Sequence, residues 1–170
     1  MGVVLLGYRG SGKSAVGYRL AARLRVPFID TDQEVMQRAG ATIAEIFARA
    51  GEEKFRTLEC EALAEALARP DGIIASGGGV VLAETNRAAL KASRFARVYL
   101  RCEAPELLRR IEADPVTAAA RPKLTTAGGM AEIRQLLAVR EPLYLEVMTA
   151  ELDVTALNVD EAVAAILQMI

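Results

Sequence analysis

Short apolar runs alternate along the chain with longer segments in which apolar residues recur every three or four positions. Runs of the first kind predict strands, and segments of the second kind predict helices. We expect strands at Val3–Leu6, Pro27–Ile29, Gly72–Ala75, Ala96–Leu100 and Glu151–Val154. We expect helices at Lys13–Leu24, Thr31–Arg38, Ile43–Arg69 with a break at Gly51, Ala83–Lys91, Pro105–Ala113, Met130–Val147 and Val159–Met169. The remaining stretch, Asp114–Gly129, has no clear period and carries prolines and paired glycines, which predicts a mobile flap.

The alternation of strands and helices predicts an α/β fold with a parallel sheet, because βαβ units pair their strands in parallel. Val3–Leu6 and Ile73–Ile74 are continuously apolar, which is typical of strands that are covered by helices on both faces. We therefore expect these two runs in central strands. A chain of 170 residues is the size of one compact domain, so residues 1–170 are expected to form a single unit.

Charge and hydropathy exclude several classes of function. The net charge is −1, and the 21 basic residues, 17 of them Arg, are scattered among 22 acidic ones, which argues against nucleic acid as a partner. The longest uncharged stretch, Gly72–Ala83, has 12 residues, fewer than the ~18 that a membrane-spanning helix needs. Near the start, only Val3–Leu6 is continuously apolar before Arg9, too short for a signal peptide, so we expect a cytoplasmic protein.

The chain contains no histidine, which excludes histidine-based triads, histidine zinc sites and histidine general bases. Cys60 and Cys102 are expected to be reduced and partly buried thiols, with no disulfide or metal site. Any proton or charge chemistry therefore depends on Asp, Glu, Lys, Arg or Tyr.

The segment after the first strand, residues 7–14 with the sequence GYRGSGKS, fits the phosphate-binding loop pattern of Gly, four residues, Gly-Lys and Ser or Thr. Its glycines allow backbone N–H groups to point inward, and the next helix adds its positive N-terminal end. Lys13 brings a full charge to the terminal phosphates, and Ser14 is expected to ligate Mg²⁺. The predicted ATP-binding residues of this loop are Gly10, Ser11, Gly12, Lys13, Ser14 and Ala15.

A dinucleotide-binding fingerprint is the alternative interpretation of the loop. Gly10, Gly12 and Ala15 satisfy its spacing, and an acidic residue, Asp30 or Asp32, follows roughly 20 residues later. That fold has no use for the Lys-Ser pair that ends the loop, so the phosphate-binding loop is favoured.

Two further clusters follow predicted strands, at the sheet edge where ligands bind in open parallel sheets. Asp30 and Asp32 come directly after Phe28-Ile29 and are expected to face the phosphate loop, although Asp30 or Thr31 also suits a helix cap. After the third strand comes Ser76-Gly77-Gly78-Gly79, where three glycines favour close backbone approach to a ligand over a plain tight turn.

Six ordered motifs carry a resemblance to the shikimate kinase family along essentially the whole chain. They are the loop at 7–14, Asp30-Thr31-Asp32, Phe55-Arg56, Gly77-Gly78-Gly79, Arg121-Pro122 and Arg140-Glu141-Pro142-Leu143-Tyr144. The resemblance implies a P-loop domain of the nucleoside-monophosphate-kinase type, with three α/β/α layers and a five-stranded parallel sheet. It also implies a substrate-binding helical segment at about residues 31–60 and a lid at about 112–128, and the predicted strands and helices agree with it.

The activity implied by the resemblance is transfer of the γ-phosphate of ATP to the 3-hydroxyl of shikimate, in the pathway to chorismate and aromatic amino acids. Mg²⁺ is the implied cofactor and a monomer the implied state. Asp32 would hold the ring hydroxyls, either orienting the reacting one or acting as its base, and Arg56 and Arg140 would grip the carboxylate. The implied substrate-binding residues are Asp32, Arg56, Gly77, Gly78, Gly79 and Arg140.

The remaining roles implied by the resemblance concern the nucleotide. Arg121 would close over ATP as a third catalytic residue beside Lys13 and Asp32, a task that Arg109 or Arg110 could share. Asp30 would help Ser14 to hold the metal. Taken without the resemblance, each arginine is better read as a solvated surface residue.

The match to the family has two departures. Lys123 follows Arg121-Pro122 where the family usually has apolar residues, and residues 153–160 lack a basic residue often found there, so the adenine contacts stay unassigned. Two other functions remain open: another small-molecule kinase of this fold, such as a gluconate kinase, and a nucleotide-binding regulatory module without turnover.

Overall fold

The computed structural model describes residues 2–114 and 129–170. Its centre is a sheet of five parallel strands in the order β2-β3-β1-β4-β5. The strands are β1 (Gly2–Leu6), β2 (Phe28–Asp30), β3 (Gly72–Ala75), β4 (Ala96–Arg101) and β5 (Ala150–Asp153). The apolar runs of β1 and β3 lie inside the sheet, as predicted. In this position a strand has a partner on each side and helices on both faces, so its apolar side chains are removed from water.

The helices begin and end within two residues of the positions that the sequence predicts. They are α1 (Lys13–Leu24), α2 (Thr31–Ala39), α3 (Ile43–Ala68), α4 (Glu84–Ala92), α5 (Ala104–Glu112), α7 (Gly129–Val147) and α8 (Val159–Leu167). The break predicted in α3 is confirmed: Gly51 has φ 77° and ψ 174°, outside the helical region. A short 3₁₀-helix, η1 (Val80–Leu82), follows the three glycines and was not predicted.

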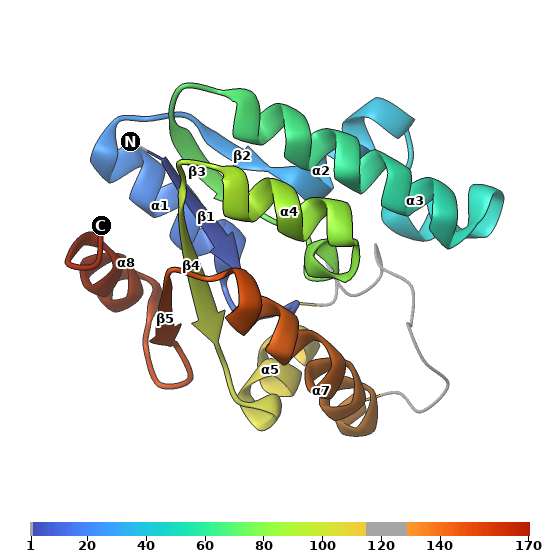
Figure 1. Cartoon of the computed structure of the whole chain (residues 1–170). Helices are drawn as coiled ribbons and strands as arrows, with labels where there is room; N and C mark the ends of the chain where they lie inside the picture. The colour runs from blue at the N-terminus through green and yellow to red at the C-terminus, as the bar shows by residue number, and fades with distance from the viewer. Residues whose placement is uncertain (1, 115–128) are drawn as a thin grey trace.

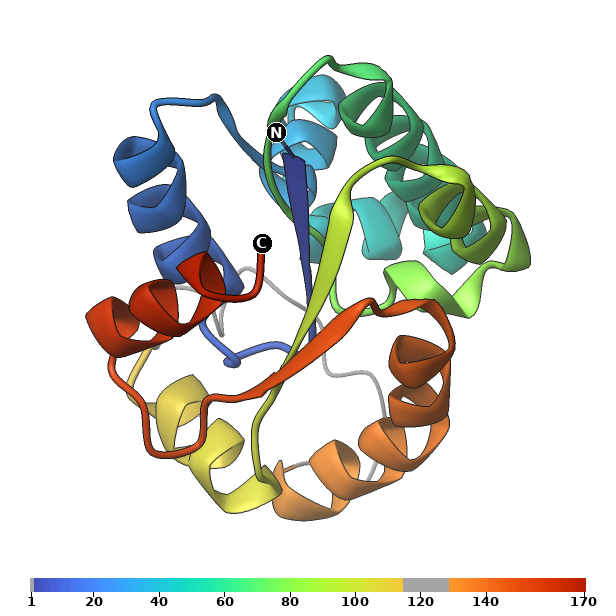
Figure 2. The same cartoon turned by 60° about the vertical axis from the view of Figure 1, so that its left-hand side comes forward.

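Two helical layers cover the sheet, as Figures 1 and 2 show. Val3 and Leu5 of β1 pack in one core cluster with residues of α1 and α8. Val4 and Leu6 point to the opposite face, into a second cluster with residues of α3, α4 and α7. The three-layer α/β/α prediction is confirmed, and both faces of β1 are buried because its side chains alternate between the two layers.

The loops after β1, β2 and β3 all leave the same edge of the sheet, because the strands are parallel. The first forms residues 7–12 before α1, the second passes directly into α2, and the third forms residues 76–79 before η1. This edge therefore brings together the three sequence clusters that were predicted to bind ligands.

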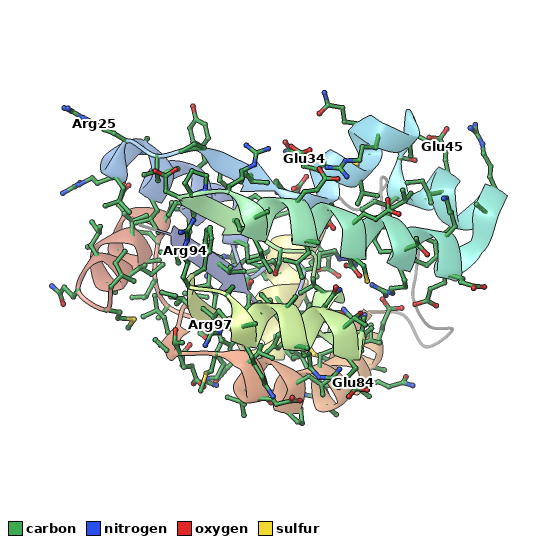
Figure 3. All side chains as sticks on the ribbon, turned by 45° about the horizontal axis from the view of Figure 1, so that its top comes forward. Arg25, Glu34, Glu45, Glu84, Arg94 and Arg97 are labelled. Atoms are coloured by element: carbon green, nitrogen blue, oxygen red, sulfur yellow. The ribbon has the colours of Figure 1, made fainter. Side chains whose placement is uncertain are left out.

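The remaining surface carries charges of both signs. Figure 3 labels exposed examples from separate helices, including Arg25 at the end of α1, Glu45 of α3 and Glu84 of α4. Both cysteines are free; Cys60 is partly buried, as predicted, whereas Cys102 is fully buried. In the part of the chain that the structure describes, no helix is long and apolar enough to cross a membrane.

Candidate active site

The loop between β1 and α1 wraps around the ammonium group of Lys13. Gly7, Gly10 and Gly12 adopt φ values of 145°, 86° and 92°, which side chains other than glycine rarely tolerate. Lys13 is only 8% exposed, and its Nζ donates hydrogen bonds of 2.8 Å to the carbonyl oxygens of Gly7 and Tyr8. The loop is thus folded around a buried cation at the N-terminus of a helix, an arrangement that suits the binding of phosphate groups.

A cavity of about 320 Å³, called here the loop cavity, lies over this N-terminus. Its lining residues are Arg9, Gly10, Gly12, Lys13, Ser14, Ala15, Asp30, Asp32, Ser76, Arg110, Ile111 and Asp114. The structure therefore brings together all the predicted ATP-binding residues of the loop except Ser11, which is 1% exposed.

Asp30 takes part in two sets of contacts, one with the start of α2 and one with the phosphate loop. Its Oδ1 accepts hydrogen bonds from the backbone N–H groups of Asp32 and Gln33, at 3.1 and 3.3 Å, and caps α2. Its Oδ2 accepts a 2.6 Å hydrogen bond from the hydroxyl of Ser14 at the wall of the loop cavity. A hydroxyl and a carboxylate side by side are oxygen ligands of the kind that Mg²⁺ takes, so this pair fits the implied metal.

A second cavity, of about 60 Å³ and called here the arginine cavity, adjoins the first. Its lining residues are Tyr8, Arg9, Asp32, Ile43, Phe47, Phe55, Arg56, Glu59, Gly78, Gly79 and Arg140. Asp32 and Arg9 line both cavities. Two apolar rings, three arginine side chains and two carboxylates thus surround a space for a small polar molecule.

Arg56 enters the arginine cavity from α3 and is held by carboxylates of the same helix. Its Nη1 lies 2.7 Å from Oε2 of Glu59, and its Nη2 lies 3.1 Å from Oε1 of Glu52. Burial works against the charged guanidinium, but Glu59 and Glu52 outweigh it, and the pKa of Arg56 is raised. A side chain at Gly79 would collide with this guanidinium, so the glycine allows the close approach.

Glu59 is a buried carboxylate that sequence reasoning missed. It is 1% exposed; burial raises the pKa of its carboxyl group, Asp32 adds to the rise, and Arg56 opposes it. A Cβ atom at Gly77 would lie 2.7 Å from Oδ1 of Asp32 and 2.6 Å from Oε1 of Glu59. The glycine therefore lets both carboxylates approach the turn. The signal available in the sequence was the position of Glu59, three residues after Arg56 in a predicted helix, where the two side chains lie on the same face.

Gly77 itself lines neither cavity, and its backbone N–H donates a 3.0 Å hydrogen bond to the buried hydroxyl of Thr31. Gly78 and Gly79 line the arginine cavity. The three predicted substrate-binding glycines thus divide into one that fastens the turn to α2 and two that border the cavity.

Arg140 reaches the same cavity from α7, far along the chain from Arg56. It is 5% exposed, its Nη1 donates a 3.3 Å hydrogen bond to the carbonyl oxygen of Gly78, and its guanidinium lies 5.6 Å from the centre of the Tyr8 ring. Its Nε has no hydrogen-bond partner among the described residues. The hydroxyl of Tyr144, one turn later, also donates to the carbonyl oxygen of Gly78, a contact that sequence reasoning missed.

The predicted nucleotide-side arginines differ in position. Arg110 lines the loop cavity, with its Nε 2.7 Å from Oε1 of Glu106 and its Nη2 donating to the carbonyl oxygen of Val154 at 2.8 Å. Arg109 is 69% exposed and does not line that cavity. Arg121, Pro122 and Lys123, with most of the predicted lid, lie outside the described residues.

Known proteins resemble this chain over most of its length. The family model described as Shikimate kinase matches residues 9–170. A shikimate kinase of Symbiobacterium thermophilum is 39% identical over 99% of this chain and 95% of its own length, and one of Thermobifida fusca is 42% identical over 94% of this chain and 88% of its own.

Among solved structures, the shikimate kinase from Acinetobacter baumannii in complex with shikimate superposes with a TM-score of 0.91. It is 34% identical, and the match covers 99% of this chain and 91% of that one. The predicted P-loop kinase fold and the resemblance stated from the motifs are both confirmed.

Proposed function

The chain belongs to the shikimate kinase family, and on that premise we propose that it transfers the γ-phosphate of ATP to the 3-hydroxyl of shikimate. The products are shikimate 3-phosphate and ADP. The observation that carries the proposal is the pair of adjoining cavities, one over the phosphate loop and one lined by Arg56 and Arg140, with Asp32 in the walls of both.

The arginine cavity suits a cyclic carboxylate. Arg140 has an unpartnered Nε within the described residues, and Arg56 presents a guanidinium whose charge is secured by Glu59. A carboxylate between two guanidinium groups accepts charge-assisted hydrogen bonds, which are stronger than bonds between neutral groups. The apolar side chains of Ile43, Phe47 and Phe55 also line this cavity and suit the carbon ring.

Asp32 is the residue we assign to the reacting hydroxyl, because it borders the space on the acceptor side and on the nucleotide side. The hydroxyl oxygen forms a bond to the γ-phosphorus, and the bond from that phosphorus to the bridging oxygen breaks, leaving the electron pair on ADP. Asp32 orients the hydroxyl and takes its proton, or orients it while the proton leaves with the product phosphate. Alignment of this kind supplies most of the catalysis that a loose transition state requires.

The phosphate loop supplies the complementary charge. Lys13 now donates to two loop carbonyls, and we expect its ammonium group to turn to the phosphate oxygens when ATP binds. Ser14 and Asp30 would hold Mg²⁺, which neutralises phosphate charge when bound. Our proposal also includes Arg121 as the lid arginine, a substrate-binding segment at about 31–60, a lid at about 112–128, and action as a monomer in the cytoplasm.

The test is a coupled ADP-release assay with Mg²⁺ and ATP, in which shikimate, quinate, gluconate and no acceptor are compared. Turnover with shikimate supports the proposal. Turnover only with gluconate would replace it with a gluconate kinase, and ATP binding without turnover on any acceptor would replace it with a regulatory module. Light scattering on the same sample tests the monomer.

A further inference from the structure

Arg9 occupies the boundary between the two cavities. It is a variable position of the phosphate loop, between Gly7 and Gly10, and it lines the loop cavity and the arginine cavity. Its backbone N lies 3.3 Å from where a Cβ on Gly78 would stand, so the phosphate loop and the glycine turn meet at this residue. Arg9 shares this double position with Asp32.

Within the described residues, the positive charge of Arg9 is not paired with a carboxylate. In residues 2–114 and 129–170, its guanidinium makes no hydrogen bond and no ion pair, although the residue is half-buried. The other arginines that line the cavities have partners: Arg56 has Glu52 and Glu59, Arg110 has Glu106, and Arg140 has the carbonyl of Gly78. A half-buried guanidinium without a partner is suited to receive an anionic ligand.

The positive charge of Arg9 influences a residue that lines the arginine cavity. Burial raises the pKa of the Tyr8 hydroxyl, and the charges of Arg140 and Arg9 oppose that rise, so the positive field of Arg9 reaches the wall of this cavity. Lys13 and Ser14 cover the nucleotide side, and Arg56 and Arg140 cover the acceptor side. Arg9 is the cation between the two groups.

We propose, on the basis of the function proposed above, that Arg9 is a further catalytic residue whose guanidinium contacts the phosphoryl group as it crosses from one cavity to the other. The γ-phosphorus must pass this boundary when its bond to ADP breaks and its bond to the acceptor oxygen forms. Negative charge on its three outer oxygens is then partly outside the phosphate loop. Arg9 stabilises that charge, while Asp32 orients the acceptor hydroxyl on the other side of the reacting centre.

The test compares Arg9→Met, which keeps the length of the side chain but removes the charge, with Arg9→Lys and with Arg23→Met. Arg23 is an exposed residue of α1 that lines neither cavity, so its variant controls for the loss of one positive charge. We expect Arg9→Met to lower kcat on the order of 100-fold, as loss of one preorganised donor does, with both KM values changed less than about threefold. Arg9→Lys should recover part of kcat, and Arg23→Met should match the wild type.

A second readout separates this role from a structural one. The variant should bind ADP as the wild type does but bind ADP with aluminium fluoride and shikimate more weakly, because only that mixture resembles the phosphoryl group in transfer. Unchanged kcat in Arg9→Met, a change in KM alone, or equal loss of ADP binding would overturn the proposal. The wild-type assay is run first: if it shows no turnover of shikimate, the proposed function fails, whereas wild-type turnover with an active Arg9→Met variant rejects the role of Arg9 alone.

Discussion

Single residues in this site use one polar atom to hold the local structure and present another polar atom to the candidate site. The carboxylate of Asp30 caps α2 through one oxygen and contacts Ser14 through the other. Arg140 donates one guanidinium N–H to Gly78 and keeps its Nε without a partner among the described residues. Such side chains are held in place before a ligand arrives, which lowers the entropy cost of binding.

Asp32→Asn tests the acceptor side at the scale of one residue. The amide keeps the size of the side chain but removes its charge and its ability to take a proton. We expect kcat with shikimate to fall roughly 100-fold or more, with ATP affinity unchanged. Steady-state kinetics and ATP binding by calorimetry measure the two effects. Asp160→Asn, the same change on the exposed surface of α8, is the control; near-normal turnover of Asp32→Asn would exclude the role.

At the scale of the element, the packing of α3 and α7 sets the distance between the guanidinium groups of Arg56 and Arg140, since α3 carries the first and α7 the second. The carbonyl of Gly78 joins α7 to the glycine turn, accepting from Arg140 and from Tyr144. The Tyr144 ring is fully buried and stacks on Tyr99, with ring centres 4.9 Å apart. The position of the turn therefore depends on α7.

Tyr144→Phe keeps the stacked ring and removes only the hydroxyl that contacts Gly78. A hydrogen bond of this kind contributes about 1 kcal/mol, so we expect the KM for the acceptor to rise about fivefold while the KM for ATP is unchanged. Tyr99→Phe is the matched control, because its hydroxyl lies 3.4 Å from Glu141 and does not contact the turn. Equal effects of the two variants on the acceptor KM would contradict the prediction.

Glu106→Gln tests α5, which carries Arg110 to the loop cavity. Hydrogen bonds from Arg109 and Arg110 lower the pKa of the Glu106 carboxyl group from 4.5 to about 2. A carboxyl group with a lowered pKa stabilises the fold above its unfolded value, and this contribution is lost as the pH falls from 4.5 toward 2. We expect Glu106→Gln to have a lower Tm at neutral pH and a shallower fall of Tm through this acidic range.

Thermal unfolding at a series of pH values measures the Glu106 effect, which should be small because the carboxylate lies near the surface, only partly buried, where solvent screens its ion pairs. Glu112→Gln, on the same helix, is the control, since Glu112 makes no ion pair within the described residues. Parallel curves of Tm against pH for wild type and Glu106→Gln would rule out the linkage.

At the scale of the whole molecule, the parallel sheet brings residues from distant parts of the chain to one edge. The order β2-β3-β1-β4-β5 places the phosphate loop between the glycine turn after β3 and the strand end of β4. A ligand bound at this edge would contact several elements at once. Their binding should therefore stabilise the fold as a unit.

Ligand-induced stabilisation is the prediction at this scale. A ligand at a hundredfold excess over its Kd adds about 2.7 kcal/mol to the stability of the native state. For a chain of this size that corresponds to a rise in Tm of roughly 5–10 °C. Thermal unfolding with shikimate should show this rise, and the same concentration of gluconate should not. A rise with gluconate alone would favour the alternative acceptor.

Much of the fold was predictable, because strands and helices have their own periods. The ends of α1 and β3 were predicted to the residue, and the kink at Gly51 followed from a glycine inside a helical pattern. The short η1 helix was missed, since three apolar residues after a glycine turn carry no period. The roles of the site residues remain predictions, although Arg56 and Arg140 line one cavity as the resemblance implied.

The sequence by itself determined the strands, the long helices and the phosphate loop, because each depends on residues that are close together in the chain. It also determined the family, because six local motifs keep their order along the chain. Only the tertiary structure decided which of the 17 arginines meet, and that Glu59 lies buried beside Asp32. It also decided that Arg9 stands between two cavities without a partner in the described residues. Such convergence depends on strand order and helix packing, which join side chains that are far apart in sequence and leave no local pattern.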